Sequence, residues 1–180
     1  MDDIKYDEQK LMELMLYVAL KCQDDKTFGN TKLNKILFFS DFCAFRKFGH
    51  PITGAVYQKL EHGPAPRRLL PAAKTLESDK RAGWQAASLG RYNNQKRLIA
   101  LQNPNLSLFA AEEIALVDWV VDQLAGKTGK EVSDLSHELP GWQCAEMGED
   151  IPYFTACLPS TPEPLTQDEL DWATEVAATI

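Results

Sequence analysis

The sequence predicts an α+β fold: a single, mainly α-helical domain with a small antiparallel sheet or hairpin. Apolar residues recur at three- and four-residue spacing along much of the chain, which is the helical period. Two Gly/Pro-rich turns enclose one short extended stretch, which favours a small sheet beside the helices. The 180 residues with 44% hydrophobic content suit one core. We expect this domain at residues 1–158, with a Pro-rich linker and a C-terminal helix at 159–180.

Two helices are predicted in the first 50 residues. The stretch 7–22 is amphipathic. A polar loop follows, and Thr31 is a suitable N-cap for a second helix over 31–48. Gly49 suits the position just beyond its end, and Pro51 cannot continue it. Because the second helix is apolar on several sides, we expect it to lie at the centre of the fold.

The middle of the chain predicts strands and a third helix. A short strand is expected at 56–60, and the Pro residues of 63–66 indicate a rigid turn. The third helix should end near Asp79. The hairpin that follows is expected to have strands at 84–89 and 97–101 and a turn around Gly90 and Asn93–Asn94.

The last part of the chain predicts helices with clear starts. A helix is expected at 109–124, and Thr128 with Glu131 forms a capping box for a short one. Thr166 and Glu169 form the same pattern before a final helix at 167–179.

Composition excludes several classes of protein. No apolar run reaches the roughly 18 residues that cross a bilayer. The N-terminus is polar and acidic, unlike a signal peptide, so a cytoplasmic protein is expected. Free buried thiols are the expected state of the widely spaced cysteines, which are Cys22, Cys43, Cys144 and Cys157.

The net charge of −7 is unevenly distributed. Residues 1–106 hold 17 Lys/Arg against 11 Asp/Glu, a net of +6, and residues 107–180 hold 2 against 15, a net of −13. The basic excess lies between Lys59 and Arg97. This pattern indicates either a positive binding face or two halves that fold against each other.

Few residues suggest chemistry. The common cofactor, phosphate and hydrolase motifs are absent, and the Cys and His residues lack metal-ligand spacing, so neither cofactor nor metal is expected. Cys43 lies on the apolar helix and should be inert. An enzyme that uses His62 or His137 as acid and base stays a minor alternative. Asp41, inside the apolar helix, needs a partner, for which Arg46 or Lys35 are candidates.

The stretch TKLNKILFFSDFCAFRKFGHPITGAVYQKLEHGPAP, residues 31–66, resembles the signature of the Panacea (SocA-like) antitoxin domain family. EVSDLSHELPGW and EDIPY, further along the chain, resemble its C-terminal signature. The similarity covers roughly residues 11–158. The resemblance implies a non-enzymatic antitoxin that binds a cognate protein toxin. It also implies an origin on a phage or other mobile element, and one mode of action in which the antitoxin delivers the toxin to a cytosolic protease.

The expected contacts with the toxin lie on the turn around Pro51–Gly54, on the Gly63–Arg68 segment and on the basic edge of the hairpin. Arg67 and Arg68 are the electrostatic candidates, since Arg is favoured at interface hot spots. The expected contact residues are Pro51, Thr53, His62, Pro64, Arg67 and Arg68. A nucleic-acid-binding regulator that uses the basic Lys59–Arg97 region is the alternative, although the acidic balance and the missing helix-turn-helix argue against it.

Overall fold

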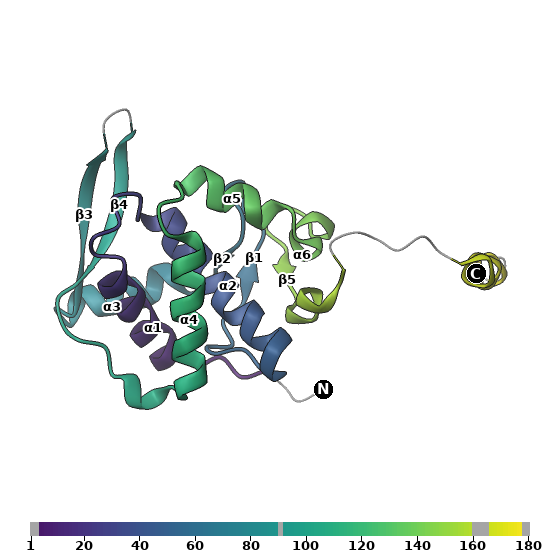
Figure 1. The fold of residues 1–180 in the computed structure, drawn as a ribbon, viewed down its shortest axis with the longest axis horizontal. Helices are drawn as coiled ribbons and strands as arrows, with labels where there is room; N and C mark the ends of the chain where they lie inside the picture. The colour runs from purple at the N-terminus through teal and green to yellow at the C-terminus, as the bar shows by residue number, and fades with distance from the viewer. Residues whose placement is uncertain (1–3, 90–91, 160–165, 178–180) are drawn as a thin grey trace.

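The computed structural model describes residues 4–89, 92–159 and 166–177, and within them it confirms a mainly helical α+β domain. The helices are α1 (Glu8–Lys21), α2 (Asn30–Phe48), α3 (Leu69–Ser78), α4 (Ala111–Leu124), α5 (Gly129–His137), α6 (Pro140–Cys144) and α7 (Gln167–Ala177), with short 3₁₀ turns η1 (Leu106–Leu108) and η2 (Tyr153–Cys157). The strands are β1 (Tyr57–Gln58), β2 (Ala65–Pro66), β3 (Ala82–Leu89), β4 (Tyr92–Ala100) and β5 (Asp150–Ile151). They form a three-stranded sheet, β2-β1-β5, and a β3–β4 hairpin (Figure 1).

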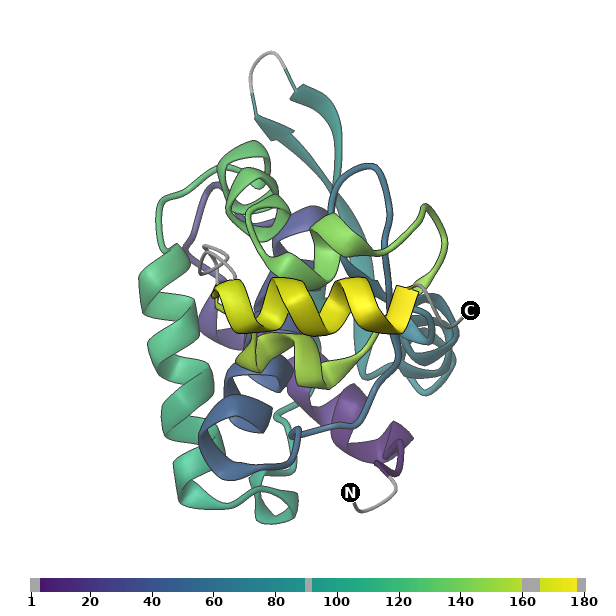
Figure 2. The same cartoon turned by 90° about the vertical axis from the view of Figure 1, so that its right-hand side faces the viewer.

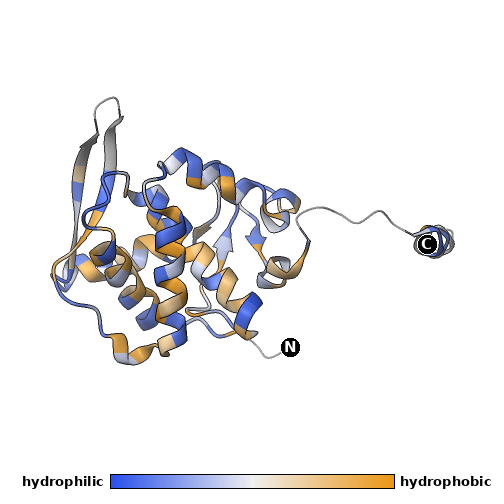
Figure 3. Ribbon diagram, in the orientation of Figure 1, coloured by the Kyte–Doolittle hydropathy of each residue, from blue (hydrophilic) through white to orange (hydrophobic). Residues whose placement is uncertain are grey.

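Helix α2 lies at the centre, as its apolar sequence predicts. It contacts α1, α4, α5, η2, β2 and β4, and Figure 3 shows hydrophobic residues along α1 and α4, which pack against it. Its first residue is Asn30, so the expected N-cap at Thr31 is wrong: extended Gly29 takes that position. Gly49 ends the helix with φ +81°, a conformation that favours glycine.

The acidic and basic halves of the chain fold against each other. Helix α4 carries Glu113, whose carboxylate accepts from Lys10 Nζ at 2.9 Å and from the backbone N–H of Ala110. On the same helix, Asp118 pairs with Lys21 and accepts from the Tyr17 hydroxyl at 2.6 Å. These contacts join α4 to α1 and support the second interpretation of the charge asymmetry.

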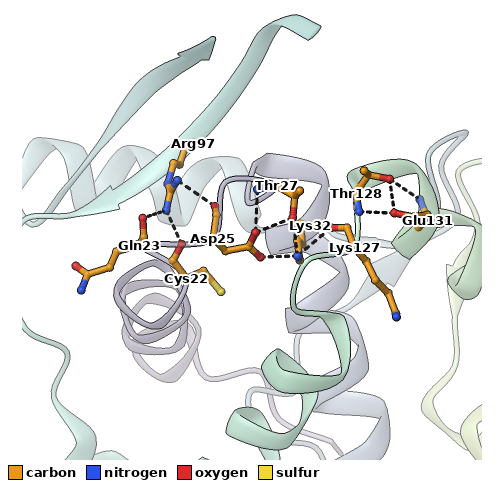
Figure 4. A network of polar contacts seen from close by, with 9 residues as sticks. All are labelled: Cys22, Gln23, Asp25, Thr27, Lys32, Arg97, Lys127, Thr128 and Glu131. Carbon is orange, nitrogen blue, oxygen red and sulfur yellow. Dashed lines mark hydrogen bonds and ion pairs between the residues drawn. The ribbon is translucent and has the colours of Figure 1, made fainter. Parts of the chain in front are cut away.

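A polar junction holds four segments together at the base of the hairpin (Figure 4). The Arg97 guanidinium, from β4, donates to three backbone carbonyls at and beyond the end of α1. Lys32, at the start of α2, is 1% exposed; its Nζ donates to Asp25 Oδ2 at 2.5 Å and to the Lys127 carbonyl at 2.9 Å. The junction therefore fixes the hairpin and the α4–α5 loop relative to α1 and α2.

The hairpin is longer than expected: β3 ends at Leu89 as predicted but begins two residues earlier, and β4 begins five residues earlier and ends one residue earlier. Ala82 pairs with Ala100 and Leu89 with Tyr92. Asn93 and Asn94 therefore belong to β4, and the prediction that they form the turn is wrong. The expected turn residue Gly90 lies outside the described residues.

Buried Asp41 links α2 to the chain that enters β1. Its carboxylate is fully buried and accepts from the Thr53 N–H at 2.7 Å, the Thr53 hydroxyl at 2.5 Å and the Tyr57 hydroxyl at 2.7 Å. Burial raises the pKa of Asp41, and these hydrogen bonds act in the opposite direction. The expected partners Arg46 and Lys35 were wrong, because positions five and six residues away on a helix face other directions.

Helix α7 stands apart from the rest of the chain. Figure 1 shows it beyond the end of the domain formed by α6 and η2, and Figure 2 shows it in front of that end.

The Thr128–Glu131 capping box is confirmed at α5. None of the described helices combines the length and the apolar character that a bilayer span requires.

Replacing Asp41 by alanine should destabilise the domain strongly. The substitution leaves the buried Tyr57 hydroxyl and the Thr53 N–H without their acceptor, and each unsatisfied group costs about 1–3 kcal/mol. We expect urea unfolding to show a loss of roughly 2–4 kcal/mol. Asp134→Ala, which removes an exposed carboxylate, is the matched control and should change stability by less than about 0.5 kcal/mol. Equal losses in the two variants would contradict this role.

Candidate partner-binding surface

The three-stranded sheet is assembled from the sequence signatures described above. β1 follows the first Gly/Pro turn, β2 lies in the second, and β5 belongs to the segment EDIPY. Both neighbours of β1 are antiparallel: Tyr57 pairs with Pro66 on one side and with Ile151 on the other. Segments about 90 residues apart in the sequence therefore form one surface.

One side of this sheet faces the core and the other faces outward. Tyr57, Pro66 and Ile151 are buried. The side chains of alternate residues point to the opposite side of a strand. The outer face, as we call it, consists of Val56, Gln58, Arg67, Asp150 and Pro152, which are exposed or half-buried, together with Ala65, which lies opposite Gln58 and is buried. Val56 is 45% exposed although it is a valine next to the central strand.

Arg67 spans the outer face. Its Nε donates to Asp150 Oδ1 at 2.5 Å, its Nη1 to Gln58 Oε1 at 2.9 Å and its Nη2 to the Gly148 carbonyl at 2.6 Å. The guanidinium is thereby held in one position, although its side chain is 43% exposed. A preorganised Arg loses little side-chain entropy when it meets a partner.

Aromatic side chains support the inner side of the sheet. Phe42 and Tyr57 lie edge to face with ring centroids 5.7 Å apart, and Tyr153 lies 4.8 Å from Phe42. The Tyr153 hydroxyl donates to the Ala55 carbonyl at 2.6 Å. The strands, which are only two residues long, thus depend on packing against α2 rather than on their few ladder hydrogen bonds.

The second turn, residues 63–66, is held in place by hydrogen bonds from α5 and α2. Ser133, on α5, donates to the His62 carbonyl at 2.8 Å, and Lys35 Nζ, on α2, donates to the Pro64 carbonyl at 3.0 Å. Gly63 has φ +86°, and a Cβ there would collide with Ser136 and Lys35. Only glycine fits, because the backbone turns tightly against both helices.

Lys35 is a buried cation without an acidic partner in the described hydrogen bonds. It is 1% exposed, and burial lowers its pKa to about 7. On the same side of the domain, the His137 ring stacks on Trp142 with centroids 3.9 Å apart. Burial, and then the charge of Lys35, lower the pKa of His137. These groups form a packed structural cluster around the second turn.

The expected contact residues differ in how they are placed. Thr53 and Pro64 are buried, and Pro51 is half-buried, so they shape the turns. His62, Arg67 and Arg68 are exposed. Their contact with a partner stays a prediction. Sequence reasoning missed Val56, Asp150 and Pro152; the alternation of Val56–Leu60 could have indicated the first, but nothing in the sequence pairs β5 with β1.

Several cations of the Lys59–Arg97 region have partners within the chain. Lys59 donates to the Ala145 carbonyl at 2.9 Å and lies over the Trp142 ring. Arg81 forms an ion pair with buried Glu13 at 2.9 Å, and Arg97 belongs to the junction of Figure 4. These contacts weaken the case for a continuous positive face.

Groups with reactive or metal-binding potential are scattered. Among the described residues, no three His, Cys, Asp or Glu side chains gather where a metal ion could be held. All the cysteines are free, but Cys144 and Cys157 are exposed, so their expected burial is wrong. Burial raises the pKa of Cys43, consistent with the expectation that this thiol is inert.

The fold and the site define a class: a helix-dominated α+β domain that presents a small, rigidly supported sheet. The antitoxin SocA-like, Panacea domain matches residues 33–143, and the chain belongs to this family. Membership supports an antitoxin-like role and a toxin partner. The match begins within α2 and ends within α6, and β5 lies just beyond it. No curated protein and no solved structure matches the chain.

Removing the buried amine of Lys35 should change how stability depends on pH. The unfolded chain keeps this proton up to about pH 10.5, whereas the folded chain releases it near pH 7. The folded state therefore carries a penalty that is full below pH 7 and is relieved as the pH rises towards 10.5. Relative to Lys35→Met, the wild type should gain roughly 2 kcal/mol in urea unfolding between pH 7.5 and 9.5. Lys74→Met, at an exposed site, should differ from the wild type in free energy of unfolding by the same amount at every pH in this range. The same pH-independent difference for Lys35→Met would refute the buried-amine account.

Proposed function

We propose that this protein is an antitoxin that neutralises a cognate protein toxin by binding it at the outer face. The exposed sheet, with Val56 between Arg67 and Pro152, is the observation that carries the proposal. The face combines an apolar centre with a fixed guanidinium and a carboxylate at 2.5 Å from it. Interfaces combine the same parts: an apolar core, an Arg anchor and a polar rim.

Rigidity supports the choice of this face. Its strands are held by Asp41, its second turn by Lys35 and Ser133, and its guanidinium by the carboxylate of Asp150. A surface that is already ordered pays little conformational entropy on association. Leu70 and Phe154, which follow Arg67 and Pro152 closely in the sequence, have exposed apolar side chains, 70% and 50% accessible.

The proposed mechanism is occlusion: the domain covers a surface that the toxin needs for its action. No group of the antitoxin has to react. The proposed neutralising unit is residues 1–158, which contain every part of the outer face. Delivery to a cytosolic protease is the other mode that the family resemblance implies, and it differs in one measurable respect, since it shortens the half-life of the toxin.

Co-expression with the product of the neighbouring open reading frame tests the function. We expect that product to arrest growth when it is expressed alone and to be harmless beside this protein. A pulse-chase measurement of the toxin should give the same half-life with and without the antitoxin. A shortened half-life would replace occlusion by delivery to a protease, and a harmless neighbouring product would refute the pairing.

Introducing a charge at the centre of the outer face should abolish neutralisation without unfolding the domain. Val56→Glu places a carboxylate where the proposed interface is apolar, and truncating or charging such an anchor typically costs 2 kcal/mol or more of binding. We expect at least roughly a thirtyfold weaker complex by titration calorimetry. Arg68→Glu should weaken binding less.

The matched control is Lys74→Glu, an exposed charge change on α3. It should bind the toxin as the wild type does. Thermal melts should show that all three variants are folded. Full neutralisation by Val56→Glu would move the contact away from this face and leave the antitoxin function itself intact.

A further inference from the structure

An apolar groove lies on the domain at the end where the chain continues towards α7. Its lining combines buried and half-buried residues of α2 and of the α6–η2 contact with exposed Arg46 and Leu158, which we call its rim. The residues that line it are Phe38, Phe39, Phe42, Cys43, Arg46, Leu139, Pro140, Gly141, Thr155, Ala156 and Leu158. Because Leu158 is a lining residue, the groove begins where the chain leaves the domain.

Helix α7 is amphipathic and presents its apolar side to solvent. Leu170, Trp172 and Val176 are 43%, 67% and 40% exposed. At 100° per residue they fall within a broad arc of about 160°, with Asp171 opposite and with Asp168 on the same face as Trp172, four residues before it. A helix with a large exposed Trp and a carboxylate beside it is suited to an apolar groove with a basic rim.

The tether allows α7 to reach this groove. Residues 159–166 separate Leu158 from the first residue of α7. Eight residues span up to about 28 Å when extended, and the 11-residue helix is about 17 Å long. A short tether also raises the effective concentration of the helix at the groove to the millimolar range.

We infer that α7 of the same chain docks its apolar side in this groove, with Trp172 as the anchor. Charge supports this occupant: α7 contains acidic residues and no Lys or Arg, and the groove rim carries Arg46, beside exposed Lys47 on α2. Docking removes exposed apolar surface from both partners, which is the main favourable contribution. The inference is independent of the proposed function, since it concerns a surface between α2, α6 and η2 and not the outer face.

Hydrogen exchange of the full chain, measured by mass spectrometry without any toxin, tests the docking. In the wild type, peptides that cover α6, η2 and α7 should be protected. Trp172→Glu should expose all three and raise their exchange at least about twofold. The matched control is Trp119→Glu, at a 53% exposed Trp of α4, which should exchange at these peptides as the wild type does.

Two results would overturn the inference. Identical exchange of α6 and η2 in the wild type and in Trp172→Glu would show that α7 does not cover the groove. Protection that rises with protein concentration, together with a dimer in light scattering, would make a second copy the occupant. Both substitutions are at exposed sites, and a thermal melt of each variant shows that the domain itself is folded.

Discussion

The fold depends on one buried carboxylate, that of Asp41. A charge removed from water is tolerated in a protein only where hydrogen bonds replace its hydration. Here the replacement comes from Thr53 and Tyr57, which lie in the loop after α2 and in β1. The central helix therefore positions β1, the middle strand of the small sheet. The arrangement of the outer face is thus fixed by a contact in the core.

Most helices could be predicted from the sequence, because their signals are local. Apolar spacing, Gly49 and the Thr128–Glu131 box concern residues within one or two turns of each other. The hairpin was located correctly, but its turn was not. Asn93 and Asn94 resemble turn residues, yet the register that begins with Ala82 opposite Ala100 carries both into a strand. The pairing between the two strands therefore outweighed the local preference of Asn for turns.

The candidate site was predictable only in part, because it joins segments that are distant in the sequence. The two Gly/Pro turns could be recognised, and the need of Asp41 for a partner was clear from its apolar surroundings. Its partners were not, since Tyr57 reaches it through tertiary structure. The position of Asp150 beside Arg67 likewise depends on the pairing of β5 with β1, for which the chain contains no local signal.

The pairing of β5 with β1 determines when the three-stranded sheet can be completed during synthesis. The ribosome releases β1 and β2 long before β5, which follows them by more than 80 residues. Non-local strands close late, after the helices that separate them. A nascent chain that ends before residue 150 therefore has no complete sheet, and Arg67 acquires its partner Asp150 only when the third strand emerges. Premature termination between β2 and β5 therefore yields fragments without the complete outer face.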